Sequence, residues 1–381
     1  MKNFLTKQYQ NDKKFKIRHN YLSEQFSDFP KIFKKIEKVI NFNDFTLGFE
    51  VNRFENNFSR LINAKNCIAV GSGTDAIYLA LKALGLSNQD EVITTPYTFY
   101  ATINAIVQAD CKPVYADAQS DFNIDPKKIE KKITKKTKAI LVVHWAGRIC
   151  DMEQIKKIAK KYKLFIVEDA CHAALAKRKN TFAGNFGDIG CFSLHPLKNL
   201  NVWGDGGMMI VKNKVIAQKL KLLRNHGLIS RNKIKIFGVN SRLDTIQAVV
   251  ANHMIKKLPH LTKKRRVNAF KLDKGLSGIK EIKIPNRYKD LFEVFHLYNI
   301  QVKKRDKLVS FLKSKSIDAK MHYPIPMHLQ EPSKKLEKYK KGDFPVAEQL
   351  CKETISLPVH EFVKSKDINY MIKCIKKFYS K

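Results

Sequence analysis

The chain has 381 residues, and its 72 Lys and Arg against 35 Asp and Glu give a formal net charge of +37 at pH 7. Hydrophobic residues make up 44% of it, which is ordinary for a globular protein with an interior core. No apolar run approaches the roughly 20 residues that a membrane-spanning helix needs, so we expect no membrane partner. The length allows two lobes, and the polar N-terminus, which resembles no signal peptide, predicts a cytoplasmic protein.

The excess of positive charge is typical of nucleic-acid-binding proteins. Here, however, the lysines are spread along the whole chain, and neither an arginine-rich arm nor an aromatic–basic RNA motif is present. We therefore expect no nucleic-acid partner and interpret the charge as compositional bias, with a positive field that attracts anionic ligands. The seven cysteines have scattered spacings without a C-x-x-C, which predicts reduced thiols and no disulfide framework or zinc site.

Short apolar runs alternate with amphipathic segments from about Asn66 onward. The pattern predicts strands at residues 67–70, 91–95, 113–117, 139–144 and 164–167. It predicts helices between them at residues 75–86, 101–108, 126–134 and 152–162. Such alternation is typical of βαβ units, in which helices cover both faces of a mostly parallel sheet.

The segments after residue 187 change in character. Strands predicted at residues 188–194 and 208–211 flank a Gly-rich turn, and a long helix is predicted at residues 241–258. From about residue 261 the pattern is α+β and ends in a helix at residues 366–379. We therefore predict a large domain at residues 1–260, beginning with a basic extension at 1–20, and a small C-terminal domain at 261–381.

Ligands of open parallel sheets bind at the carboxyl ends of strands, so the residues that follow each strand are the candidates. Residues 71–74, G-S-G-T, follow the first strand and open a helix, where backbone N–H groups could bind a phosphate. A tight strand–helix turn would explain this segment equally well. The aromatic run around Phe99 follows the second strand, and it could stack on a planar ring or form a turn in the core.

Two further strand ends carry polar side chains. Asp169 follows an apolar strand, where a buried carboxylate needs a partner such as a protonated ring nitrogen, a lysine, or a metal ion shared with His172. No third metal ligand is evident, so we predict no metal site. Lys198 follows the strand that ends near Ser193. It could form an imine with an aldehyde if partly desolvated, although a solvated lysine is the default in so basic a chain.

The strand ends together offer four features that one cofactor could use. These are a phosphate-binding turn, to which Ser193 can contribute, an aromatic ring for stacking, a carboxylate for a ring nitrogen and a lysine for an aldehyde. Pyridoxal 5′-phosphate has all four corresponding groups. The combination is far more specific than any one of its parts.

At these residues the chain resembles the nucleotide-sugar aminotransferases of the DegT/StrS type, which are fold-type-I PLP-dependent enzymes. The resemblance runs from about residue 44 to the end. The blocks that carry it include E-D-A-x-H (168–172), G-D-I-G-C-F-S-L-H-P-L-K-N-L (187–200), G-D-G-G (204–207), R-N-H-G (224–227), G-V-N-S-R-L-D (238–244) and H-Y-P-I-P-M-H (322–328). It implies an α/β fold in which a mostly parallel seven-stranded sheet lies between helices, with a smaller α+β C-terminal domain.

The resemblance also implies roles for the residues at the strand ends. Lys198 would form the Schiff base and move the proton, and Asp169 would pair with the pyridine nitrogen. Phe99 would stack on the ring, and His172 would contact the hydroxyl side of the ring.

Gly73, Thr74 and Ser193 would bind the phosphate of the cofactor. Asn240 would reach the phosphate in the neighbouring subunit, so the resemblance implies a homodimer with two shared active sites.

The activity that the resemblance implies is transfer of an amino group, with glutamate as donor, to a nucleotide-linked keto-sugar for surface polysaccharide or glycan assembly. His322 and Tyr323 match a segment near the sugar pocket. Some relatives carry histidine in place of the lysine and catalyse a dehydration, so Lys198 favours transamination. A sugar dehydratase, a regulatory protein of the same family and a basic nucleic-acid-binding module remain the alternatives.

Overall fold

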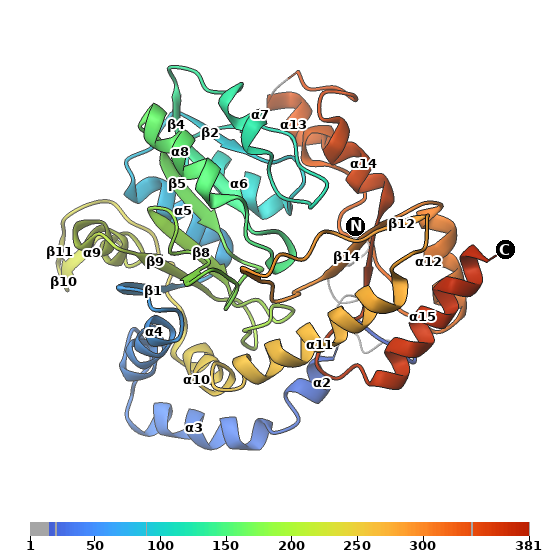
Figure 1. Cartoon of the computed structure of the whole chain (residues 1–381). Helices are drawn as coiled ribbons and strands as arrows, with labels where there is room; N and C mark the ends of the chain where they lie inside the picture. The colour runs from blue at the N-terminus through green and yellow to red at the C-terminus, as the bar shows by residue number, and fades with distance from the viewer. Residues whose placement is uncertain (1–14, 20, 89, 337, 381) are drawn as a thin grey trace.

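Seven strands form the central sheet of the computed structural model, which describes residues 15–19, 21–88, 90–336 and 338–380 (Figure 1). In spatial order they are β1 (Asn66–Val70), β9 (Gly207–Val211), β8 (Ile189–Ser193), β5 (Phe165–Asp169), β4 (Thr137–Val143), β2 (Glu91–Thr94) and β3 (Lys112–Tyr115). β9 is antiparallel to β1 and β8, whereas the other neighbouring pairs are parallel. The predicted mostly parallel seven-stranded sheet is therefore confirmed.

Helices cover both faces of this sheet, because successive side chains of a strand point to opposite faces and both sets are apolar. Ala69 of β1 belongs to one core and its neighbour Ile68 to the other. The first core includes residues of α4 (Phe49–Ile62), α8 (Met152–Tyr162) and α10 (Thr245–Met254). The second includes residues of α5 (Gly73–Ala83), α6 (Tyr100–Gln108) and α9 (Lys214–Leu223).

A third core lies in the C-terminal lobe. It is built by β14 (Tyr298–Val302) and β15 (Thr354–Leu357) with α11 (Leu258–Leu276), α12 (Arg305–Ser314) and α15 (Ser365–Tyr379). Ile17 is buried in this core and bridges to Ile317, so this part of the predicted basic extension packs on the C-terminal lobe. Residues 1–14 and 20 of that extension lie outside the described residues, and the division near residue 260 stays a prediction.

The remaining elements are short or peripheral. They are α2 (Leu22–Gln25), α3 (Phe29–Asn41), α7 (Pro126–Glu130), α13 (Glu331–Leu336), α14 (Pro345–Glu353), β6 (Lys177–Arg178), β7 (Thr181–Phe182), β10 (Leu228–Ser230), β11 (Lys233–Ile234), β12 (Ile282–Lys283) and β13 (Leu291–Phe292). The 3-10 turns are η1 (Trp145–Gly147) and η2 (Met327–Leu329).

The prediction of one long helix at residues 241–258 is wrong in its bounds. α10 begins only at Thr245 and ends at Met254, and a new helix, α11, begins at Leu258. Pro259 lies in the first turn of α11, where a residue without an N–H is tolerated but cannot continue a preceding helix.

A buried carboxylate fixes the loops at one edge of the sheet. Glu168 of β5 is fully buried, and its Oε1 accepts hydrogen bonds from the backbone N–H groups of Phe186 (2.7 Å) and Gly187 (2.6 Å). Its Oε2 accepts from the Gly184 N–H at 2.7 Å and pairs with His144 Nε2 at 2.8 Å. Since His144 Nδ1 accepts the Cys150 N–H, the proton lies on Nε2, which donates to Glu168. Four donors thus compensate for the loss of hydration.

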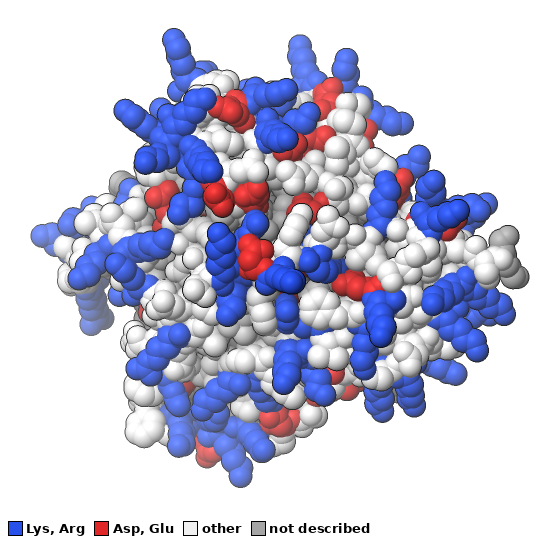
Figure 2. All heavy atoms as spheres, in the orientation of Figure 1, with Lys and Arg blue, Asp and Glu red and all other residues white. Residues whose placement is uncertain are grey.

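Positive charge is spread over the surface. Figure 2 shows Lys and Arg distributed over the whole visible face, in keeping with the expected compositional bias. No helix among the described residues has both the length and the apolar character needed to cross a bilayer.

We predict that Glu168→Gln lowers the free energy of unfolding by about 3 kcal/mol, because the new amide turns N–H groups toward backbone donors that need an acceptor. Urea unfolding of the cofactor-free protein measures this. Glu153→Gln, at an exposed position on α8, is the control and should change the midpoint little. Equal midpoints for the two variants would contradict the role given to Glu168.

Candidate active site

The candidate residues meet at the carboxyl edge of the central sheet. In the strand register, Asp169 of β5 is opposite Cys191 of β8, and Ser193 of β8 is opposite Gly207 of β9. Gly207 is also opposite Val70, the last residue of β1. The ends of β1, β5 and β8 therefore lie close together, as the sequence pattern predicts.

The turn after β1 packs so closely on β8 and β9 that only glycine fits at two positions. In the turn itself, a Cβ atom on Gly73 would lie 2.7 Å from the Ser193 Cβ. In β9, a Cβ atom on Gly207 would lie 2.2 Å from the Ser72 carbonyl oxygen of the turn. Ser72 caps α5 by accepting the Asp75 N–H through its Oγ at 3.0 Å. Gly73 and Thr74 begin the helix, where backbone N–H groups have no partner within the helix and can bind an anion.

The Asp169 carboxylate is buried and held by uncharged donors. Its Oδ2 accepts from the Thr102 hydroxyl at 2.8 Å, and its Oδ1 accepts from the Cys171 N–H at 3.1 Å. The Thr102 oxygen also shares a hydrogen bond of 2.8 Å with the Thr98 hydroxyl. This arrangement fixes the orientation of the carboxylate and leaves its charge for a cationic group.

Lys198 lies in the turn after β8, where its backbone N–H donates to the His195 carbonyl at 2.8 Å. Burial lowers the pKa of its amine below the ordinary value of 10.5, and the fields of Cys171 and Asp169 oppose this shift. Desolvation makes the neutral, nucleophilic amine more accessible near neutral pH.

His172 is held between two rings that the sequence did not single out. Its ring centroid lies 4.3 Å from that of His296 and 5.4 Å from that of Trp145. Burial, with the field of Lys198, holds the pKa of His172 well below its ordinary value, so the imidazole is neutral. Its Nδ1 is buried without a hydrogen-bond partner among the described residues, which leaves it available to a ligand.

Phe99 and the segment of His322 and Tyr323 come together from opposite ends of the chain. The Phe99 and Tyr323 ring centroids are 5.5 Å apart. The Tyr97 hydroxyl donates to the His322 carbonyl at 2.6 Å and joins the two segments. Burial lowers the pKa of His322 to about 3, so this side chain is neutral.

Among the described residues, no contact joins Asn240 to the other candidate site residues. It is exposed and bridges to Asn225, near the hairpin of β10 and β11. Its neighbour Ser241 accepts the Gly71 N–H at 3.1 Å and donates to Asp75 Oδ2 at 2.8 Å. The segment is therefore anchored next to the glycine turn while Asn240 itself faces outward.

The site residues fit pyridoxal 5′-phosphate. The glycine-lined turn suits a phosphate, the buried Asp169 suits a protonated ring nitrogen, and the desolvated Lys198 suits an aldehyde. The described residues contain no cluster of three His, Cys, Asp or Glu side chains arranged for a metal ion.

Sequence reasoning missed several residues of this site. Thr102, which holds Asp169, lies three residues after Phe99, but nothing in the sequence shows that its hydroxyl faces a carboxylate 67 positions away. Trp145 and His296 gave no signal, since a single aromatic residue or histidine is typical of a core. Only the folded chain brings them to His172.

Residues 28–376 match the model of the DegT/DnrJ/EryC1/StrS aminotransferase family. The chain is 38% identical to a pleiotropic regulatory protein of Geobacillus stearothermophilus, over 94% of this chain and 97% of that one. It is 36% identical to the dTDP-3-amino-3,6-dideoxy-alpha-D-galactopyranose transaminase of Aneurinibacillus thermoaerophilus, over 91% of this chain and 95% of that one. Among solved structures, S. venezuelae DesV in complex with a ketimine intermediate superimposes with a TM-score of 0.93 at 30% identity, covering 96% of this chain and 99% of that one.

We predict that Thr102→Val weakens binding of pyridoxal 5′-phosphate about tenfold, because Asp169 loses a hydrogen bond that orients its charge. An absorbance titration of the cofactor-free protein measures the dissociation constant. Thr102→Ser keeps the hydroxyl and should bind nearly as the parent does. If the two variants bind the cofactor equally well, the hydrogen bond has no such role.

Proposed function

The chain belongs to the DegT/DnrJ/EryC1/StrS aminotransferase family, and from this premise we propose that it transfers an amino group to a nucleotide-linked keto-sugar, with Lys198 and Asp169 as catalytic residues. The family uses pyridoxal 5′-phosphate, and relatives over nearly the whole length are nucleotide-sugar transaminases. The observation that carries the residue assignment is the desolvated Lys198 amine, whose pKa also responds to the field of the buried Asp169 carboxylate.

When bound, pyridoxal 5′-phosphate supplies an aldehyde that captures amines and a ring that accepts electrons from the neighbouring C–H bond. Asp169 would pair with the ring nitrogen and keep it protonated. Lys198 would hold the aldehyde in the resting protein. Once free, its amine would accept the proton from the donor Cα and act as the general base and acid of the transfer.

The other site residues bind and orient. Gly73 and Thr74 at the start of α5 and Ser193 at the end of β8 would hold the phosphate through N–H and O–H donors. Phe99 would cover the ring, and His172 would offer to the ring hydroxyl the Nδ1 that has no partner among the described residues. His322 and Tyr323, beside Phe99, border the space for the sugar.

We propose glutamate as the amino donor, following the resemblance of the sequence. A positive field from a net charge of +37 favours both an acidic donor and an anionic nucleotide-sugar. The product is suited to assembly of a surface polysaccharide or glycan.

We also propose a homodimer whose subunits share their active sites. Asn240 is exposed on one chain, and nearby Phe237 is 92% exposed, with Ile229 at 50% and Ile234 at 47% on the β10–β11 hairpin. Apolar side chains gathered at a protruding hairpin are typical of an interface. A second copy would cover them and receive Asn240 at its cofactor phosphate.

A regulatory role without turnover is the second candidate, because one close relative is named a pleiotropic regulatory protein. Such a protein could keep the cofactor and still fail to exchange it with glutamate. Turnover therefore separates the two candidates.

We predict an absorbance band of bound cofactor that glutamate bleaches in the wild type. Lys198→Ala should lose at least about a hundredfold in turnover with a panel of keto-sugar nucleotides, since both amine capture and proton transfer need the lysine. Lys160→Ala, at an exposed lysine of α8, is the matched control. A stable band that glutamate leaves unchanged would favour the regulatory candidate.

We predict subunit complementation between two inactive variants. Asn240→Asp places a carboxylate against the partner's cofactor phosphate, so Lys198→Ala and Asn240→Asp should each be inactive alone. Co-expressed, half of the dimers would be mixed, each with one intact site, which restores about a quarter of wild-type activity. Asn232→Asp, an exposed control before the same segment, should stay active. No recovery in purified mixed dimers would contradict shared sites.

A further inference from the structure

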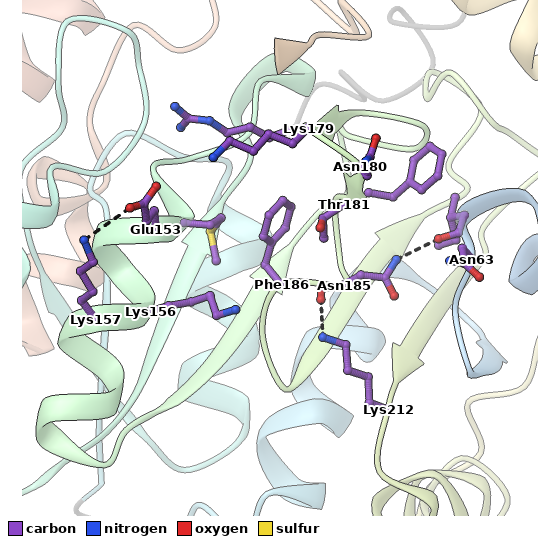
Figure 3. Close-up of a pocket in the computed structure, with 14 residues that line it drawn as sticks. Asn63, Glu153, Lys156, Lys157, Lys179, Asn180, Thr181, Asn185, Phe186 and Lys212 are labelled. Atoms are coloured by element: carbon purple, nitrogen blue, oxygen red, sulfur yellow. Dashed lines mark hydrogen bonds and ion pairs between the residues drawn. The ribbon is translucent and has the colours of Figure 1, made fainter. Parts of the chain in front are cut away.

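A hollow of about 580 Å³ lies on the face of the sheet that carries α8, away from the candidate active site (Figure 3). None of the residues assigned to the cofactor lines it. Its volume is within the range of small-molecule sites, roughly 300–1,000 Å³. α8, the β6–β7 hairpin and the segments after α4 and β9 enclose it.

The walls of this hollow combine an apolar floor with a basic rim. Ile62 and Met152 are buried beneath it, and the rings of Phe182 and Phe186 are half-buried along it. The cations that line it come from three separate elements: Lys156, Lys157, Arg178, Lys179 and Lys212. Glu153 is the single carboxylate among the lining residues.

Part of this charge is not neutralised inside the protein. Lys157 pairs with Glu153 at 3.4 Å, and Arg178 pairs with Asp290 at 3.0 Å. Lys156 and Lys179 form no ion pair with any of the described residues. Figure 3 shows Lys156 extending toward Phe186, whereas Lys157 turns away to Glu153. An anion in the hollow would therefore meet unpaired ammonium groups.

The floor is fixed in advance by the fold. The loop of Gly184, Phe186 and Gly187 donates three backbone N–H bonds to the buried Glu168 carboxylate. Asn185 in the same loop donates to the Ile62 carbonyl at 3.0 Å and accepts from Lys212 Nζ through its own carbonyl at 2.5 Å. A ligand would not have to order this loop, which reduces the entropic cost of binding.

We propose that the hollow is a second ligand site, for a small phosphorylated molecule that contains a ring. The phosphoryl groups would lie along the basic rim that Lys156, Lys179 and Lys212 contribute to, and the ring would pack on Phe182 and Phe186. A nucleoside diphosphate has this chemistry. The proposal does not rest on the proposed function, because it uses no residue of the candidate active site.

Isothermal titration of the full-length protein with uridine diphosphate tests the site. The pocket variant carries Lys156→Glu and Lys179→Glu, which remove no ion pair among the described residues. The control variant carries Lys135→Glu and Lys313→Glu, which change the net charge equally at exposed positions outside the hollow. Urea midpoints of all proteins verify that folding is intact.

We expect the wild type to show a binding component for uridine diphosphate whose dissociation constant rises at least about tenfold in the pocket variant. In the control variant this dissociation constant should stay unchanged. Binding at the active site would persist in all three proteins, so it forms a separate component. We expect inorganic pyrophosphate and uridine each to bind more weakly than uridine diphosphate. Identical isotherms for the three proteins would overturn the proposal, as would pyrophosphate or uridine binding as tightly as the nucleotide.

Discussion

The buried carboxylate of Glu168 is the interaction on which the surrounding structure depends. It is fully buried in the middle of the sheet, and it binds the end of β4 through His144 and the loop before β8 through three backbone N–H groups. Losing hydration costs several kcal/mol for such a group, so the loops that supply its donors cannot move away cheaply. Asp169 follows it directly in the chain. The same interaction therefore fixes both the strand end that carries Asp169 and the floor of the basic hollow.

Burial, more than surface charge, sets the protonation of the active site. The chain carries a net charge of +37, but its exposed cations are screened by salt within about 10 Å. Desolvation lowers the pKa values of Lys198, His172 and His322. The imidazoles of His172 and His322 are therefore neutral, and the neutral form of the Lys198 amine costs less to reach, which suits a site that must capture amines and move protons.

The sheet, and the position of Asp169 and Lys198 at its carboxyl edge, were predictable because their signals are local. Asp169 and Lys198 each follow an apolar strand within a few residues, and parallel topology brings such ends to one edge. The break between α10 and α11 was missed because the apolar residues Met254, Ile255 and Leu258 continue the pattern across it. The contacts of Thr102, Trp145 and His296 were not predictable, since each depends on packing between distant segments. Asn240 was predicted from resemblance alone, and a single chain leaves it exposed.

The central claim is that Lys198 carries the cofactor. Borohydride reduction of the protein with equimolar pyridoxal 5′-phosphate at neutral pH, followed by peptide mass spectrometry, tests it most directly. The account predicts one dominant reduced adduct at Lys198, because its lowered pKa and its neighbours favour capture there over the many exposed lysines. Adducts scattered over surface lysines, with Lys198 unmodified, would contradict the account.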